Sequence, residues 1–299
     1  MMKLNTIAAF TLAMVMFTSC NKKEALDKNQ VLIDSLSQIE FQGDKFADIE
    51  VLKYDIPSWN KLTLKEKKLV YYLAQAGYAG RDIFWDQNYK YNLKIRAALE
   101  NIYKNYDGDK NAEDWKKFEI YLKRVWFSNG IHHHYSNDKI KPGFSQSYFQ
   151  KLLKQTDTNL DGTIVEILFN DVDAKKVNLD ESKGLVQGSA INFYGKNVSA
   201  VDVEKFYNSY VQEDSLRPVS SGLNTKLVRN NSGKLEEKVW KSGGMYGAAI
   251  DQVIFWLEKA VTVAENPAQA DALKLLIEFY KTGDLKTWDA YNIAWLNAT

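Results

Sequence analysis

The chain of 299 residues contains a single cysteine, Cys20, and therefore cannot close a disulfide bond within itself. Its folded state must depend on the packing of apolar side chains instead. Hydrophobic residues make up 45% of the sequence and aromatic residues 13%, which is enough to fill a substantial core. The length suits one large domain or two small ones.

The cysteine follows a segment that is typical of an exported protein. Lys3 supplies a positive charge, and the apolar run 7–17 is well below the ~20 residues that a membrane-spanning helix needs. We interpret residues 1–19 as a signal peptide and Cys20 as the lipid acceptor of a bacterial lipoprotein, anchored in the periplasm or at the outer membrane. The alternative is an ordinary secretory signal followed by a chance cysteine. The polar residues 20–48 predict a flexible tether.

The charge balance gives no sign of a nucleic-acid partner. Lys and Arg number 39 and Asp and Glu 38, so the formal net charge is +1. Neither a basic stripe nor an acidic tail stands out in the sequence. We therefore expect no nucleic acid to bind, and we expect contact with the membrane only through the lipid anchor.

Residues 49–215 carry apolar side chains at helical spacing, with capping residues ahead of several segments. The clearest start signal is a capping box, in which the side chains at a helix start satisfy each other's backbone N–H groups. The predicted helices begin at a Thr63–Glu66 box, run over 82–104, follow a cap at Asn111, cover 145–155, and run from Ser199 and Asp202 to Tyr210. Residues 165–177 form a short amphipathic piece within this block.

The periodicity changes in the last third of the chain. Residues 222–240 hold two β-favouring runs around an Asn- and Gly-rich loop, which predicts a β-hairpin. Helices are predicted over 244–296, with Pro267 at the first position of one helix and Gly283 at its end. The fold class is therefore α+β, predominantly helical with a smaller β-hairpin or barrel portion.

All three histidines are adjacent, at positions 132–134. In an extended chain, His132 and His134 would share one face and could bind a metal ion. A zinc site needs three or four ligands, and the HExxH pattern of catalytic zinc helices is absent from the sequence. The alternative is structural: the imidazoles hydrogen-bond loop carbonyl groups near Tyr135 and Asp138.

The segment 157–164 matches the first half of a calcium-binding EF-hand loop. Asp157, Asn159 and Asp161 occupy ligand positions and Gly162 the turn, but Leu168 stands where a bidentate Glu should close the site. We favour a turn rich in Asp and Asn that leads into a helix over a calcium site.

Two other features suggest chemistry only weakly. The glycine-rich segment 243–247 could hold an anion at a helix start, but it lacks the Walker Lys-Ser/Thr, so a tight strand-to-helix turn is favoured. Aromatic residues could line a glycan or peptide groove, but Trp115, Trp126 and Trp256 lie at core spacing on predicted helices. Neither a Ser-His-Asp nor a Cys-His set can be assembled, so no catalytic residue is assigned.

Five short strings of residues occur along the chain in the following order: GYAGRDIFWDQN at 77–88, NGIHHHYS at 129–136, GLNTKLV at 222–228, KVWKSGGMY at 238–246 and YKTGDLKTW at 280–288. With them, the region from about residue 45 to 299 resembles the N-terminal portion of the dipeptidyl peptidase III family, in its Bacteroidetes lipoprotein form. Each string alone is weak, and their joint order gives the resemblance its specificity.

The resemblance implies a zinc-dependent exopeptidase that removes dipeptides from the N-terminus of short peptides. Such an enzyme has two lobes around a cleft: an upper helical lobe with an HExxGH zinc motif and a downstream Glu ligand, and a lower lobe of helices and a β-barrel that binds the peptide as an added strand. Residues 49–299 resemble the first stretch of the lower lobe.

The sequence departs from this pattern because HExxGH and the downstream acidic ligand are missing. We therefore expect a partial or truncated product that binds no zinc and is inactive alone, while an intact enzyme would bind zinc and short peptides. The competing hypothesis is a complete, non-enzymatic outer-membrane lipoprotein that binds peptide or glycan.

Overall fold

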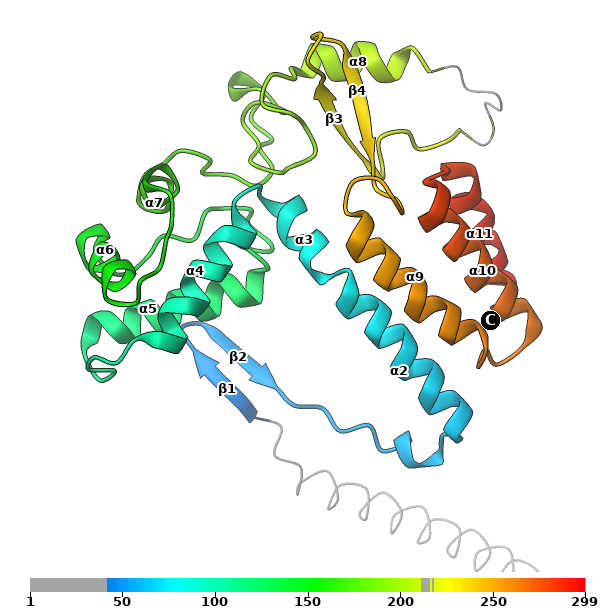
Figure 1. Ribbon diagram of the computed structural model, residues 1–299, viewed down its shortest axis with the longest axis horizontal. Coiled ribbons are helices and arrows are strands. Elements are labelled where there is room, and N and C mark those ends of the chain that lie inside the picture. Colours follow the sequence, from blue (N-terminus) through cyan, green and yellow to red (C-terminus); the bar gives the residue numbers. More distant parts are fainter. Residues whose placement is uncertain (1–41, 211–215, 217, 299) are drawn as a thin grey trace, which may run out of the picture. The chain divides into compact units, whose positions relative to one another are not determined.

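The computed structural model describes residues 42–210, 216 and 218–298 (Figure 1). The predicted signal peptide, the predicted lipid acceptor Cys20 and most of the predicted tether lie outside these residues. The chain divides into two units, residues 1–60 and 61–299. Among the described helices, none has the length and apolar character needed to cross a membrane.

The described part of the first unit contains an antiparallel hairpin of β1 (Gln42–Phe46) and β2 (Ile49–Leu52). Ala47, in the turn, has a φ of 52°. The structure differs here from the tether predicted over residues 20–48, whose last residues form the first strand and the turn of this hairpin. A 3-10 turn, η1 (Trp59–Lys61), spans the boundary between the units in sequence.

The second unit contains two hydrophobic cores, of which the first is closed by four helices. Leu99, Trp115, Phe118 and Phe149 have no exposed surface at all. Side-chain caps start two of the helices; at one of them the Ser145 hydroxyl accepts a hydrogen bond from Tyr148 N–H. The four helices are α4 (Asn92–Asn105), α5 (Glu113–Ser128), α6 (Gln146–Gln155) and α7 (Gly162–Phe169).

The single helix predicted over 82–104 is wrong, because the structure contains two helices, α3 (Arg81–Asn88) and α4. Tyr89 lies between them in an extended conformation, with no exposed surface. Its hydroxyl donates to the Asp173 carboxylate at 2.7 Å. Burying this ring and satisfying its hydroxyl offsets the helical hydrogen bonds that are lost at the break.

The predicted cap at Asn111 is also wrong by one residue, since α5 begins at Glu113 after Ala112. The N–H of Asn111 instead donates to the Asp109 carboxylate at 2.8 Å, within the preceding turn. An Asp or Asn side chain competes with the helix for nearby backbone groups, and here the turn takes precedence.

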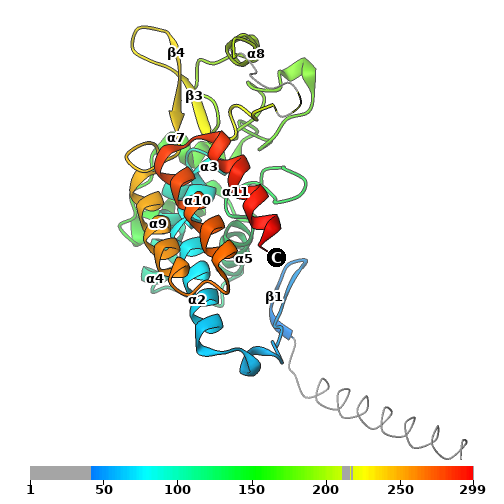
Figure 2. The same ribbon diagram turned by 90° about the vertical axis from the view of Figure 1, so that its right-hand side faces the viewer.

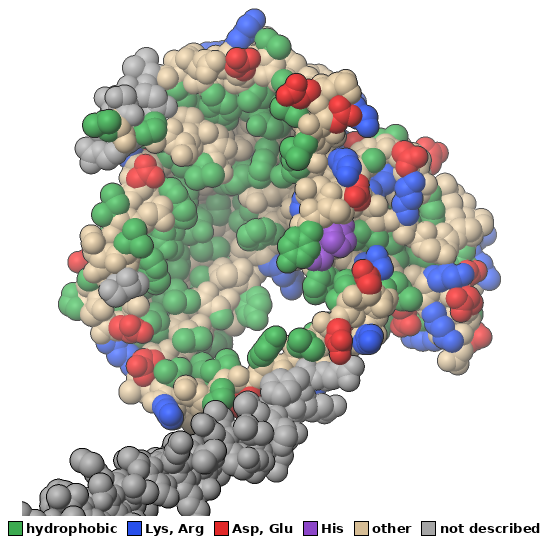
Figure 3. All heavy atoms as spheres, turned by 180° about the vertical axis from the view of Figure 1, so that it is seen from behind, with side chains coloured by type: hydrophobic (Ala, Val, Ile, Leu, Met, Phe, Trp, Pro, Cys, Tyr) green, Lys and Arg blue, Asp and Glu red, His purple; other side chains and the backbone are tan. Residues whose placement is uncertain are grey.

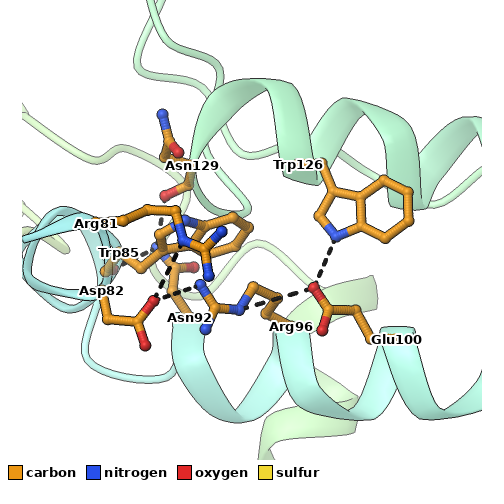
Figure 4. A network of polar contacts seen from close by, with 8 residues as sticks. All are labelled: Arg81, Asp82, Trp85, Asn92, Arg96, Glu100, Trp126 and Asn129. Atoms are coloured by element: carbon orange, nitrogen blue, oxygen red, sulfur yellow. Dashed lines mark hydrogen bonds and ion pairs between the residues drawn. The ribbon is translucent and has the colours of Figure 1, made fainter. Parts of the chain in front are cut away.

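A polar network joins α3, α4 and α5 (Figure 4). The Arg96 guanidinium lies 2.8 Å from Asp82 and 3.9 Å from Glu100, and Glu100 accepts a hydrogen bond of 3.0 Å from Trp126 Nε1. Trp126 is consequently 37% exposed, which corrects its assignment to the core. The partner that the Trp126 N–H finds, the Glu100 carboxylate, lies at the surface.

Asn92 fixes the turn after α5 from inside the core. It is fully buried, donates to the Trp85 carbonyl at 3.0 Å and accepts from Ile131 N–H at 3.1 Å. Gly130 passes so close that a Cβ there would lie 2.1 Å from Asn92 Nδ2, and its φ is 144°. Only glycine fits this approach and this backbone conformation.

The second core lies where α2, α9 and α10 pack together (Figure 2). Leu69, Ile250 and Ala260 are almost fully buried there, and Trp256 is half-buried and stacks on Tyr72. The capping box, Pro267 at a helix start and the left-handed Gly283 at a helix end are present as predicted. The helices are α2 (Leu64–Ala79), α9 (Gly247–Val261), α10 (Pro267–Thr282) and α11 (Leu285–Asn297), which packs on α10.

The predicted hairpin is formed by β3 (Thr225–Arg229) and β4 (Leu235–Val239), which pair antiparallel. Helix α8 (Ala200–Asn208) starts at Ser199 with Asp202, as predicted, and the two residues form a capping box. It contacts the hairpin through a 3.0 Å hydrogen bond from the Tyr207 hydroxyl to Glu237. The segment between α7 and α8 is irregular apart from the 3-10 turn η2 (Glu181–Lys183), so the amphipathic piece expected over 165–177 is helical only as far as Phe169. The fold class is α+β and mostly helical, as predicted.

Candidate functional site

A groove of about 480 Å³ opens beside the second core. Figure 3, which views the molecule from behind, shows hydrophobic side chains gathered in a hollow next to α10 and α11. A concave, mainly apolar pocket of this size is the default candidate for a binding site. We call it the apolar groove; its lining includes Leu73, Gly77, Ile83, Phe84, Gln87, Leu223, Asn224, Trp240, Val253, Leu257, Phe279, Tyr280 and Trp288.

Four of the five strings that carry the family resemblance meet in the apolar groove. String 77–88 supplies Phe84, string 222–228 supplies Leu223, string 238–246 supplies Trp240, and string 280–288 supplies Trp288. String 129–136 instead follows α5 beside the first core. These strings are far apart in sequence, so their convergence is a result of the fold.

Backbone hydrogen bonds hold the end of the apolar groove where the hairpin meets α10. The Asn224 side-chain amide donates to the Gly283 carbonyl at 2.9 Å, and the Asn224 carbonyl accepts from Trp240 N–H at 2.9 Å. Ser242 N–H donates to the Tyr280 carbonyl at 2.9 Å. A Cβ on Gly283 would lie 2.5 Å from Val239 Cγ1, so this wall admits only glycine there.

The chemistry of the apolar groove favours binding over catalysis. Its described lining residues include no Asp, Glu, His, Lys or Arg. The indole Nε1 of Trp240 is buried without a hydrogen-bond partner among the described residues. Among the described lining residues only Tyr280 has an ionisable side chain, and burial raises its pKa. The lining is therefore suited to hold an apolar segment.

A polar contact next to the apolar groove fixes the start of α9. The Tyr246 hydroxyl donates to the Asp86 carboxylate at 2.6 Å, and burial together with this carboxylate raises the pKa of Tyr246. Tyr246 has a φ of 62°, and α9 begins only at Gly247, later than the glycine pair at which its start was expected. The N–H groups of Gly244, Met245 and Gly247 bond backbone carbonyls, as a tight strand-to-helix turn requires.

Neither a protein-family model nor a curated protein matches this chain. Solved structures do match, among them the following two. "Structure of DPP III from Caldithrix abyssi" matches 82% of this chain with a TM-score of 0.50 and 20% identity. "Structure of dipeptidyl-peptidase III from Corallococcus sp. strain EGB" matches 84% with a TM-score of 0.52 and 16% identity. The chain has a partial dipeptidyl peptidase III-like fold. It spans 34% and 35% of those two chains.

The histidines of this dipeptidyl peptidase III-like chain do not converge on one point. His132 is 2% exposed, and its Nε2 lies 2.8 Å from the carbonyl of Asp173. His133 and His134 stack on each other outside, with His134 Nδ1 3.4 Å from Ser128 Oγ. Burial lowers the pKa of His132, so the neutral ring is favoured. His132 thus bonds a loop carbonyl, that of Asp173 rather than one near Tyr135.

The calcium-like loop and the histidines do not build a metal site with the residues that surround them. Asp161 caps α7 by accepting from Thr163 N–H at 2.8 Å, and Asp157 turns the chain with a φ of 48°. Within residues 42–210, 216 and 218–298, no three His, Cys, Asp or Glu side chains gather in a geometry that could hold a metal ion. The donor set that zinc requires is therefore not assembled by the described residues.

The sequence alone does not reveal the apolar groove as a site. Apolar periodicity places Leu73, Val253 and Leu257 on buried helix faces but says nothing about which of those faces is only partly covered. The one signal in the sequence is the set of strings that carries the family resemblance. Assuming that these strings meet in the folded chain would have pointed to the apolar groove.

Proposed function

We propose that this chain is the N-terminal part of the lower lobe of an exported, zinc-dependent dipeptidyl peptidase that removes dipeptides from the N-terminus of short peptides. One observation carries the proposal: the fold is similar to dipeptidyl peptidase III structures over 82–84% of the chain. Since the chain spans about a third of those structures, the proposal places the zinc site in a further part of a longer polypeptide.

In this proposal the chain is a scaffold. The apolar groove supports it because large apolar side chains along it are left open: Phe84 is 64% exposed and Leu223 53% exposed. Contiguous exposed apolar surface marks a site of interaction. A further apolar segment of the longer polypeptide would pack here and complete the second core.

Zinc, when bound in the intact enzyme, lowers the pKa of a bound water and polarises the scissile carbonyl. The described residues of this chain do not fit that ion, because His132 bonds the Asp173 carbonyl and His134 faces Ser128. Their part is to build and hold the lower lobe.

The proposed location is the periplasm or the outer membrane, with Cys20 as the lipid acceptor. The apolar run 7–17 followed by a lone cysteine supports this. Labelling cells that express the chain with radioactive palmitate should mark the protein, and Cys20→Ser should remove the label while leaving export intact. A labelled Cys20→Ser variant, or an unlabelled wild-type chain, would contradict the anchor.

A non-enzymatic lipoprotein that binds peptide or glycan is not favoured, because the fold is similar to that of a peptidase. The reading frame downstream of codon 299 distinguishes the two functions. The proposal expects an in-frame continuation that encodes HExxGH and a downstream Glu, and a product of that longer frame that releases dipeptides. A stop codon with no such sequence downstream in any frame would count against the peptidase and favour the binding lipoprotein.

A further inference from the structure

A second cavity, of about 450 Å³, is lined in part by Asn192, whose side chain bonds the Asp86 carboxylate. It is formed by the irregular segment before α8, by the break between α3 and α4, and by strand β3. We call it the lysine pocket; its polar lining includes Lys90, Lys196, Lys226, Tyr91, Tyr194 and Asp173.

The three lysines of the lysine pocket are not neutralised. Among the described residues, none of the three has a carboxylate within ion-pairing distance. Lys90 and Lys196 are exposed, whereas Lys226 is half-buried on β3. Burial and the nearby charge of Lys90 lower the pKa of Lys226, while Asp86 opposes them. Three ammonium groups that share a pocket with no carboxylate in ion-pairing contact repel one another, and an anion that joins them relieves this repulsion.

Hydrogen bonds to Asn192, and from Asn192 to Asp86, fix the position of the Lys226 ammonium. The ammonium donates to Asn192 Oδ1 at 2.5 Å, and Asn192, which is 6% exposed, donates through Nδ2 to the Asp86 carboxylate at 2.9 Å. The same carboxylate oxygen accepts from Tyr246. The chain of contacts fixes the ammonium but uses only one of its three donors, so two remain for a ligand.

The rest of the wall suits an oxyanion. The hydroxyls of Tyr91 and Tyr194 have no hydrogen-bond partner among the described residues and can donate. The one carboxylate of the wall, Asp173, accepts from the Tyr89 hydroxyl at 2.7 Å. Three ammonium groups therefore outweigh one hydrogen-bonded carboxylate.

A neighbouring cavity of about 730 Å³ also contains lysines, but these lysines form ion pairs. There Lys175 lies 2.5 Å from Asp138, and Lys183 lies 3.5 Å from Asp180. Its lysines are paired, and nothing in it calls for an anion. The unpaired state of the lysines is thus a property of the lysine pocket and not of every lysine on this surface.

We propose that the lysine pocket binds a small oxyanion, a carboxylate or phosphate group, with the Lys226 ammonium as the central donor and Lys90 and Lys196 at the rim. Charge-assisted hydrogen bonds from a fixed ammonium are stronger than neutral ones, and the hydroxyls of Tyr91 and Tyr194 complete the set. This inference does not depend on the peptidase proposal.

The test is calorimetric titration of the full chain at low ionic strength with two probes: inorganic phosphate, and a short peptide with a free C-terminal carboxylate compared with its amide. We expect saturable binding of one anion per chain. Lys226→Met should weaken it about tenfold or more, and Lys90→Met, at an exposed position, should weaken it less. Lys154→Met, on α6 and outside the lysine pocket, removes the same charge and should leave binding unchanged.

The outcomes separate the sources of the anion. If the chain binds phosphate and does not distinguish the peptide acid from its amide, the ligand of the lysine pocket is free phosphate. If the chain binds the peptide acid more tightly than the amide, the ligand is a carboxylate. Either result supports the proposal. Absence of saturable binding for both probes overturns it, and so does equal weakening by Lys226→Met and Lys154→Met, which would show diffuse attraction. If the melting curve shows that Lys226→Met does not fold, Lys90→Met takes its place. Weaker anion binding by Lys90→Met than by Lys154→Met then supports the proposal, and equal binding overturns it.

Discussion

The core of α4–α7 and the core of α2, α9 and α10 contain the same kinds of side chain but differ in how far they are covered. In the first, Leu99, Trp115 and Phe149 have no exposed surface. In the second, Ile250 is 1% exposed where α9 is packed, yet Phe84 is 64% exposed along the apolar groove. One core is closed by its helices and the segments between and beside them, and the other leaves a face to which a further apolar segment can bind.

The largest expected effect separates the two regions directly. Leu99→Ala should lower the free energy of unfolding by about 2–5 kcal/mol, because it opens a cavity in a closed core. Leu223→Ala, at a residue that is 53% exposed in the apolar groove, should change it by no more than about 0.5 kcal/mol. Urea denaturation of both variants measures this, and equal losses would mean that the two cores are equally closed.

Two glycines sharpen the same comparison. Gly130→Ala should cost about 2 kcal/mol or more, because its φ is 144° and the new Cβ would meet Asn92. Gly77→Ala lies within α2 on the apolar groove, where a Cβ meets nothing within 4 Å, and should stabilise by about 0.5–1 kcal/mol. Melting temperatures should move in opposite directions; a destabilised Gly77→Ala would show that the apolar groove has no free space.

The buried His132 beside the first core predicts a pH dependence. Its pKa in the folded chain lies below the ordinary value near 6.5, so the unfolded chain binds the proton more readily. Its contribution to stability is complete above about pH 6.5 and is lost as the pH falls below that value. His132→Gln, which keeps a donor for the Asp173 carbonyl, should make the free energy of unfolding fall less between about pH 8 and pH 5 than it does in the wild type.

Denaturation curves of the wild type and His132→Gln at several pH values measure this difference. His133, which is next to His132 but partly exposed, provides the matched control through His133→Gln. A pH profile that His132→Gln leaves unchanged would mean that His132 is not held neutral by burial.

The smallest effect on stability is expected at the mouth of the apolar groove. Phe84→Ser should alter the free energy of unfolding by no more than about 0.5 kcal/mol, because the ring is mostly exposed. It should nevertheless reduce binding of an apolar dye, since it removes part of an open apolar surface. If Phe84→Ser binds the dye as well as the wild type does, the exposed apolar surface that binds the dye is not the apolar groove.

Local signals in the sequence predict much of the fold. The Thr63–Glu66 and Ser199–Asp202 boxes, Pro267 and Gly283 each act within one helical turn, and each is present in the structure. The break at Tyr89 cannot be predicted in this way because its cause, the carboxylate of Asp173, lies 84 residues away in sequence. The spacing of Trp126 matches that of core residues, while its partner Glu100 lies on another helix.

The candidate sites are less accessible to sequence reasoning. The lysine pocket depends on Lys226, Asn192 and Asp86, which come together only in the folded chain, and no spacing rule relates them. His132 and His134 are close in sequence, but whether they share a face depends on a buried contact with Asp173.

The central claim is that this chain is scaffold and that hydrolysis needs a metal-holding part of a longer polypeptide. It is tested most directly by incubating the full chain with a dipeptidyl arylamide in the presence of zinc, with and without a chelator. The claim predicts no release of the arylamine above the buffer rate in either sample. Release by this chain alone that the chelator abolishes would contradict it.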